Sequence, residues 1–239
     1  MGTAGYAWPA EVLQEDCCGL ICRLLLVSDR ENFMRFVDLF AGIGGVRLGF
    51  ERAFPGSETV FVSEQNKKAV ETYRANFPTP ESVHGDITQV GVGYVPEFDI
   101  CLAGFPCQAF SMAGKRKGFE DDYKGQSRGT LFAEIVRICE VRKPQVIFCE
   151  NVKGLLSHGR GNTLRVIVGA FEEIGYKVHY EVLNSKDFGV PQNRERVYIV
   201  CFRDDVDDSG FSFPAGSSES SGVIEDILDP SPVPAKYYL

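Results

Sequence analysis

The feature that most constrains the fold is a repeated pattern of short apolar runs that alternate with longer helical stretches. Apolar runs of this length predict buried strands. Alternating strands and helices predict a largely parallel sheet, whose carboxyl ends meet at one edge, where such sheets bind ligands. The residues at five predicted strand ends, which are therefore expected at this edge, are Phe40, Glu64, Asp86, Cys107 and Glu150.

The order of predicted elements specifies the architecture further. The two last predicted strands have no helix between them, which indicates an antiparallel hairpin at one edge of a seven-stranded sheet. Three polar residues, Asn66, Thr130 and Asn162, are predicted to cap helices. The predicted strands lie near residues 35–40, 59–63, 84–87, 98–103, 146–149, 177–183 and 196–202, and the main helices near 67–76, 131–142 and 162–173.

A glycine-rich turn, residues 41–45, joins the first strand to the first helix. Such a turn lets a ligand approach the backbone and the helix N-terminus closely. Glu64 lies about twenty residues later, where α/β folds place a carboxylate on a ribose. A nicotinamide dinucleotide would fit both features, but its G-x-G-x-x-G motif requires glycine where this sequence has Arg47. The pattern favours a nucleoside ligand without a pyrophosphate.

Cys107 follows a predicted strand that Gly104 and Pro106 bring to an end. A polar stretch follows it, as far as residue 129. A thiol at a strand end beneath such a stretch is a candidate nucleophile. The alternative is a buried, inert cysteine, which is what most free cysteines are.

Composition narrows the class of protein. The formal net charge is −8, whereas a nucleic-acid-binding protein usually has a basic surface. If the chain acts on nucleic acid, its phosphate-binding charges are local or on another polypeptide.

Eight cysteines in mostly apolar patterns, without paired CxxC motifs, predict reduced thiols and no metal site. No apolar run is long enough to span a bilayer, and we expect a cytoplasmic protein.

Four motifs in order resemble the DNA cytosine-5 methyltransferases. They are residues 36–45 (FVDLFAGIGG), 104–108 (GFPCQ), 150–152 (ENV) and 192–196 (QNRER). The resemblance covers roughly residues 35–203 and implies a Rossmann-like fold with S-adenosylmethionine as methyl donor. The donor-binding positions that it implies are Phe40, Gly42, Gly44, Gly45, Glu64, Asp86, Ile87, Pro106 and Leu131.

The resemblance also implies a covalent mechanism on a cytosine flipped out of duplex DNA. Cys107 would attack carbon 6 of the base, and Glu150 would bind and protonate its N3. Arg194 and Arg196 would hold the base and a neighbouring phosphate, although a surface ion pair with Glu195 is an alternative for both. Positions implied to contact the substrate are Gln108, Ser111 and Gln192.

The chain is expected to comprise an extension with one helix (1–33), a catalytic and donor-binding domain (34–203), and a linker (204–239) that begins a recognition region. Met34 as the natural start is an alternative for the first part. We expect a second polypeptide to supply target recognition and the C-terminal motifs that close the donor site, or else the chain is a shortened form. The system expected is of the bacterial restriction-modification type. Alternative functions are a tRNA cytosine-5 methyltransferase, a donor-binding module without catalysis, and a dinucleotide oxidoreductase.

Overall fold

The computed structural model describes residues 33–77, 82–106, 131–217 and 223. Cys107, Gln108, Ser111 and the predicted cap Thr130 lie outside these residues, as do residues 1–32 of the predicted extension and most of 218–239. Among the described residues no helix is long and apolar enough to cross a membrane.

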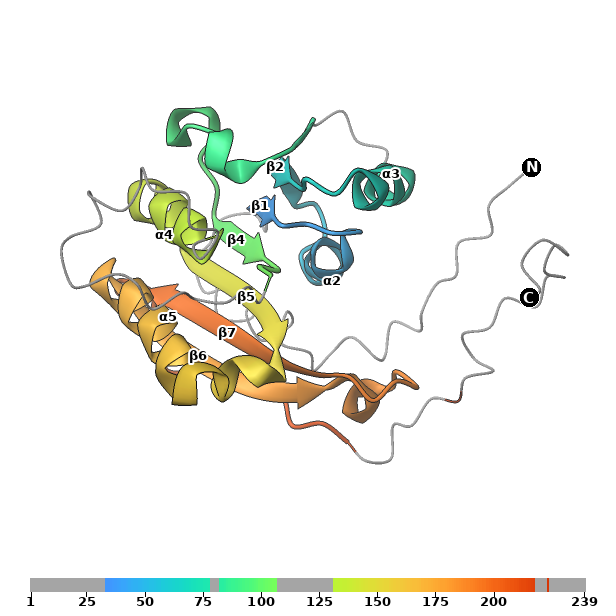
Figure 1. The fold of residues 1–239 in the computed structure, drawn as a ribbon, viewed down its shortest axis with the longest axis vertical. Helices are drawn as coiled ribbons and strands as arrows, with labels where there is room; N and C mark the ends of the chain where they lie inside the picture. The colour runs from blue at the N-terminus through green and yellow to red at the C-terminus, as the bar shows by residue number, and fades with distance from the viewer. Residues whose placement is uncertain (1–32, 78–81, 107–130, 218–222, 224–239) are drawn as a thin grey trace, which may run out of the picture.

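Within the described part of the chain, a seven-stranded sheet forms the centre of the fold (Figure 1), with the order β3-β2-β1-β4-β5-β7-β6. Only β7 runs antiparallel to its neighbours β5 and β6. The predicted mostly parallel sheet with an antiparallel hairpin at one edge is therefore confirmed. The strands are β1 (Arg35–Leu39), β2 (Glu58–Ser63), β3 (Val83–His84), β4 (Ile100–Ala103), β5 (Val146–Val152), β6 (Tyr176–Asn184) and β7 (Glu195–Arg203).

Helices cover both faces of the sheet (Figure 1). On one face pack α4 (Leu131–Arg142) and α5 (Asn162–Glu173), and on the other α2 (Gly45–Ala53) and α3 (Lys67–Asn76). Side chains alternate across the pleat, so Val37 joins the core under α4 and α5 whereas Phe36 packs against Phe50 of α2. This burial on both faces explains why the central strands are continuous apolar runs.

Short 3₁₀ turns occupy several connections that the sequence pattern does not distinguish from loops. They are η2 (Ile87–Gln89), η3 (Val92–Tyr94), η4 (Lys153–Leu156), η5 (His158–Gly161) and η6 (Ser185–Phe188). Asn66 caps α3 as predicted, accepting from the N–H groups of Lys68 and Ala69. The predicted cap Asn162 is wrong by one residue, because the N-cap of α5 is Gly161 in a left-handed conformation.

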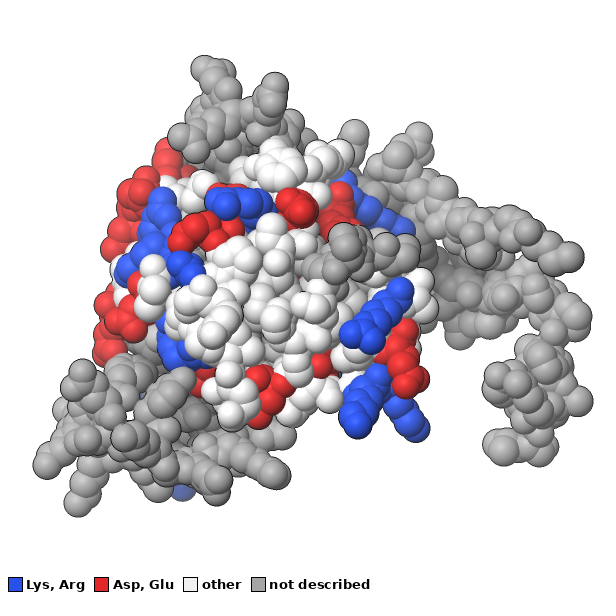
Figure 2. All heavy atoms as spheres, turned by 90° about the horizontal axis from the view of Figure 1, so that it is seen from above, with Lys and Arg blue, Asp and Glu red and all other residues white. Residues whose placement is uncertain are grey.

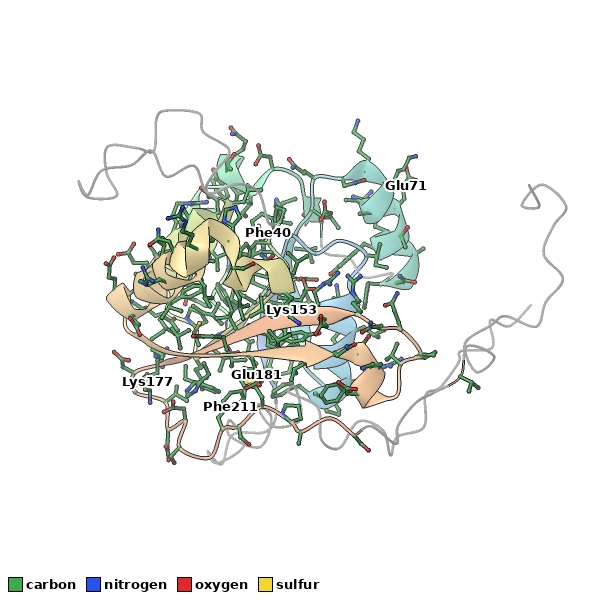
Figure 3. The ribbon with its side chains drawn as sticks, turned by 60° about the horizontal axis from the view of Figure 1, so that its bottom comes forward. Phe40, Glu71, Lys153, Lys177, Glu181 and Phe211 are labelled. Carbon is green, nitrogen blue, oxygen red and sulfur yellow. The ribbon has the colours of Figure 1, made fainter. Side chains whose placement is uncertain are left out.

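The chain after β7 returns to the sheet instead of leaving it at once. Asp208 accepts from Lys177 at 2.5 Å and lies 2.7 Å from Nε2 of His179, while Phe211 packs edge-on against that imidazole. Lys177 and Phe211 lie together, away from Phe40, in Figure 3. The first part of the segment predicted as a surface linker is thus attached at the amino edge of the parallel strands, opposite the ligand-binding edge.

Candidate active site

The turn after β1 has an unusual backbone. Phe40, Gly42 and Gly44 all have positive φ angles, of 57°, 56° and 88°. A non-glycine residue in this region costs roughly 1–2 kcal/mol, and such strain gathers at functional sites. Ideal Cβ atoms built on Gly42 and Gly45 meet nothing within 4 Å, so the backbone is open to a ligand there. The turn therefore has the form that the sequence predicts for close approach of a nucleoside.

Gly44 is needed for packing as well as for its conformation. A Cβ at this position would lie 2.2 Å from a ring carbon of Phe77, at the end of α3. The Phe77 ring is held from another side by the Arg47 guanidinium, 4.4 Å from the ring centroid. The turn thus sits directly on the core between α2 and α3.

We expect Gly44→Ala to lower the free energy of unfolding by about 2–4 kcal/mol, since left-handed strain and displacement of Phe77 add together. Gly56→Ala is the matched control, because Gly56 has φ +89° but nothing within 4 Å of a built Cβ. Its cost should be about 1–2 kcal/mol from strain alone. Urea unfolding measures both, and equal losses would contradict the packing role of Gly44.

Glu64 joins two segments of the predicted donor site. Its Oε2 accepts from the N–H of Gly42 at 2.9 Å, and its Oε1 accepts from the N–H of Asn66 at 2.7 Å. A carboxylate has about four acceptor positions, so ribose hydroxyls could still donate to it. Sequence spacing predicted where Glu64 lies but not that it closes the glycine turn.

A buried polar network lies beneath the turn. Arg47, only 2% exposed, donates to Glu51 at 2.6 Å and to the Tyr73 hydroxyl at 2.8 Å. The Tyr73 hydroxyl in turn lies 3.5 Å from Oδ2 of Asp38 on β1. Burial raises the pKa of Asp38 to about 7, against the opposing effects of Arg47 and the Tyr73 hydrogen bond. Arg47 therefore supports the glycine-rich turn from below.

The raised pKa predicts a pH-dependent stability. Below the ordinary value of 3.8 the neutral Asp38 stabilises the fold fully, and this contribution is lost as pH rises towards about 7. Relative to Asp38→Asn, the unchanged chain should lose about 3 kcal/mol of unfolding free energy between about pH 5 and about pH 8. Urea titrations across this range test it, and parallel pH profiles for the two proteins would contradict it.

The next predicted contact to the methyl donor, Asp86, lies just after β3. Asp86 caps η2, with its Oδ1 accepting from the N–H and hydroxyl of Thr88 at 3.0 and 2.8 Å. Its Oδ2 accepts no hydrogen bond from the described residues, so Asp86 is both a turn cap and a potential acceptor. Ile87 is 2% exposed, and Leu131 is the half-buried first residue of α4.

The strand that leads to the candidate nucleophile is tied to the next strand. The Asn151 side chain, 2% exposed, donates from Nδ2 to the carbonyl of Phe105 at 2.9 Å. Its Oδ1 accepts from the N–H of Val152 at 2.8 Å. Phe105 is two residues before Cys107 and next to the exposed Pro106, so the ENV motif directly fixes the backbone that enters the GFPCQ motif.

The antiparallel pairing of β5 with β7 brings two distant motifs together. Glu150 is opposite Tyr198, so Arg196 is its diagonal neighbour on the same face. Arg196 Nε lies 2.8 Å from Glu150 Oε1, and both side chains are largely covered, at 19% and 23% exposure. This pairing supports the sequence prediction that Arg196 and Glu150 act in one site.

The other predicted residues of the last motif are placed differently. Glu195 pairs with Lys153 at 2.7 Å, so the alternative of an ion pair between Glu195 and either arginine is wrong. Arg194 is exposed; its N–H is bound by Asn184, and no described interaction links its side chain to Glu150. Gln192 accepts through its backbone carbonyl from Ser185 at 2.6 Å. The structure therefore joins Arg196 to Glu150 but does not bring Arg194 there.

Four cysteines lie within the described residues. The described cysteines Cys101, Cys139, Cys149 and Cys201 are all buried and free, and burial raises the pKa of the last three well above 9.0. They are core residues and poor nucleophiles.

On the face shown in Figure 2, basic and acidic side chains of the described part are interspersed around a broad uncharged area, without a continuous basic patch.

The sheet order, the glycine turn and the acids at the strand ends define a Rossmann-like α/β fold of the methyltransferase class. Solved structures agree on the fold: Dnmt2 of S. pombe has a TM-score of 0.62 at 23% identity, covering 85% of this chain and 63% of that one. A methyltransferase of Entamoeba histolytica, EhMeth, has a TM-score of 0.64 at 20% identity, covering 87% and 63%.

The chain belongs to the C-5 cytosine-specific DNA methylase family, whose model matches residues 34–239. It is 49% identical over 208 residues to the type II methyltransferase M.HhaI of Haemophilus parahaemolyticus, covering 87% of this chain and 61% of that protein. It is 51% identical over 198 residues to the type II methyltransferase M.NlaX of Neisseria lactamica, covering 83% and 60%. The chain therefore spans about 60% of the length of these relatives.

Proposed function

We propose that this chain is the catalytic and donor-binding part of a DNA cytosine-5 methyltransferase that acts on a flipped-out cytosine in duplex DNA. The observation that carries the proposal is the Glu150–Arg196 pair at 2.8 Å, next to Asn151, which holds the backbone two residues before Cys107. These residues come from three separate motifs, and the chain's family supports the same reaction.

S-adenosylmethionine is the methyl donor that membership of this family implies, and the described residues fit it. Gly42 and Gly45 leave the turn open to a ligand, Glu64 has acceptor capacity for ribose hydroxyls, and Oδ2 of Asp86 suits an adenine amino group. When bound, the donor supplies an electrophilic methyl group on a sulfonium. The residues proposed to hold it are Phe40, Gly42, Gly44, Gly45, Glu64, Asp86, Ile87, Pro106 and Leu131.

The chemistry assigns a role to each catalytic residue. The Cys107 thiolate forms a bond to carbon 6 of cytosine, and Glu150, as the acid, protonates N3, which makes carbon 5 nucleophilic. Carbon 5 then takes the methyl group, its proton leaves to a base as the bond from sulfur to carbon 6 breaks to restore the thiolate, and N3 returns its proton to Glu150. Arg196 holds Glu150 and faces the charge that develops on the ring, and Arg194 is proposed to bind the base or a nearby phosphate.

The target base must leave the duplex, because its reacting atoms are inaccessible in the stack. Gln108, Ser111 and Gln192 are proposed to contact the extruded nucleotide and its neighbours. The remaining divisions of the chain, an extension over 1–33 and a region over 204–239 that leads to target recognition, are likewise proposals. Reading of a target sequence, as in a restriction-modification system, is proposed to need sequence outside these 239 residues, on this or a second polypeptide.

Transfer of a tritiated methyl group tests the proposal. The chain alone should methylate duplex DNA weakly or not at all, and should gain activity when the C-terminal remainder of a type II relative is supplied. Duplex DNA and tRNA are offered in parallel. Strong site-specific methylation by the 239-residue chain alone would contradict the need for further sequence. Methylation of tRNA but not DNA would favour the tRNA enzyme, and donor binding without transfer to either would favour a binding module.

A further inference from the structure

Arg137, in the middle of α4, connects two parts of the proposed donor site that are far apart in the sequence. Its Nη2 donates to the backbone carbonyls of Ile87 at 3.3 Å and Val90 at 3.0 Å. These carbonyls belong to η2 and to the residue that follows it. Arg137 therefore attaches the turn that begins after Asp86 to the helix that begins at Leu131.

The η2 turn needs such an attachment. It contains three residues, and its own backbone bonds are those from Gln89 to Asp86 and from Val90 to Ile87, both at 3.1 Å. A turn this short has little stability of its own, because few hydrogen bonds offset the cost of fixing its backbone. The orientation of the Asp86 carboxylate therefore depends on what holds the carbonyls of η2.

Arg137 is itself held rigidly. Glu134, one turn earlier on α4 and 5% exposed, accepts from Arg137 Nε at 2.8 Å and from Nη2 at 2.5 Å. A charge-assisted pair with this geometry fixes the planar guanidinium, and the second N–H of Nη2 is then shared between the carbonyls of Ile87 and Val90. Burial makes the pair costly to break from one side only, since a lone buried charge would remain.

We propose that Arg137, oriented by Glu134, is a positioning residue that sets the edge of the donor site that recognises the adenine base. Arg137 acts through the backbone of η2 and does not touch the donor. The inference rests on the proposed function, in which Asp86 and Ile87 meet the adenine of S-adenosylmethionine. Loss of Arg137 should therefore reduce discrimination between purine bases more than it reduces affinity in general.

Arg142 provides a matched control on the same helix. Its Nη2 donates to the carbonyls of Val92 at 2.9 Å and Gly93 at 3.4 Å, and its Nη1 pairs with Glu97 at 2.7 Å. It thus attaches η3 to α4 as Arg137 attaches η2. Because η3 holds none of the proposed donor contacts, loss of this pair should leave base recognition unchanged.

The experiment compares S-adenosylhomocysteine, the product of methyl transfer, with its analogue S-inosylhomocysteine. In the analogue an oxo group replaces the amino group of the adenine. Dissociation constants are measured by calorimetry on the full chain and on Glu134→Gln/Arg137→Gln, which removes the charges of both partners of the pair at once. Glu97→Gln/Arg142→Gln is the control, and circular dichroism confirms folding of each variant. Neither readout requires methyl transfer.

The unchanged chain should prefer the adenosyl compound by about tenfold or more, as expected for a hydrogen bond to a carboxylate. The ratio should fall to within about twofold of one in the Arg137 variant and persist in the Arg142 control. An unchanged ratio in the Arg137 variant would overturn this inference while leaving the donor site in place. Failure of the unchanged chain to bind either compound would overturn both this inference and the proposed donor site.

Discussion

We expect Cys107→Ser to abolish methyl transfer while donor binding survives. A serine hydroxyl is far less ionised than a thiol at neutral pH and cannot supply the nucleophile that adds to carbon 6. Removing a covalent nucleophile costs roughly 10⁴-fold or more in turnover, because the steps that follow it cannot begin. The measurement is tritiated methyl transfer to duplex DNA by the chain completed with a relative's C-terminal remainder, alongside calorimetry with S-adenosylhomocysteine.

Cys139→Ala is the control for the loss of a cysteine as such. Cys139 is buried on α4, and burial raises the pKa of its thiol well above 9.0. Its removal should cost about 1 kcal/mol or more of stability through the cavity it leaves, without a matching loss of turnover in the folded protein. Full turnover in Cys107→Ser would show that the nucleophile is another group.

The second large effect is expected for Glu150→Gln, which should lower turnover by about 10²–10⁴-fold. The amide cannot protonate N3 and no longer forms a charged pair with Arg196, which lies 2.8 Å away in the unchanged protein. Donor affinity should change little, because the proposed donor contacts lie outside β5 and β7, in the turn between β1 and α2, after β2, at η2, after β4 and at the start of α4.

Glu195→Gln is the control, because it makes the same chemical change at a carboxylate close to Glu150 in the fold. Glu195 is a half-exposed carboxylate that pairs with Lys153 at 2.7 Å, and exposed pairs of this kind contribute little. Its replacement should leave turnover within about threefold of the unchanged level, since about 0.5 kcal/mol is at stake. Equal losses in the two variants would mean that general surface charge, and not the acid at Glu150, supports the reaction.

Local patterns in the sequence predicted the sheet and the position of most candidate residues. Apolar runs and glycine-rich turns are local signals, so the ends of β1 and β2, just before Phe40 and Glu64, could be located from composition and spacing alone. Glu150 was predicted to follow the end of its strand but lies within β5, because pairing with β7 continues the strand to Val152. Asn66 was correctly predicted as a cap because capping depends on the next three residues. Asn162 was not, because the left-handed turn before it makes Gly161 the cap instead.

Contacts between elements could not be predicted in the same way. Whether Arg194 or Arg196 lies beside Glu150 depends on the register of β7 against β5, because the two arginines are two residues apart and a two-residue shift would bring one to the place of the other. The burial of Arg47 depends on α3 packing beside α2, which places Tyr73 and Phe77 around its guanidinium. Arg47 is also the residue that rules out a G-x-G-x-x-G motif. Nothing in the neighbouring sequence indicated that its side chain would lie beneath the glycine-rich turn and support it.

Covalent capture on DNA that contains 5-fluorocytosine tests the central claim most directly. Fluorine at carbon 5 cannot leave as a proton does, so the bond between Cys107 and carbon 6 persists after methyl transfer. With S-adenosylmethionine, a random-sequence duplex and the completed chain, we predict a denaturation-resistant protein–DNA band that is absent in Cys107→Ser. A band that persists in that variant, or methylation of ordinary DNA without any adduct on the fluorinated duplex, would contradict the account.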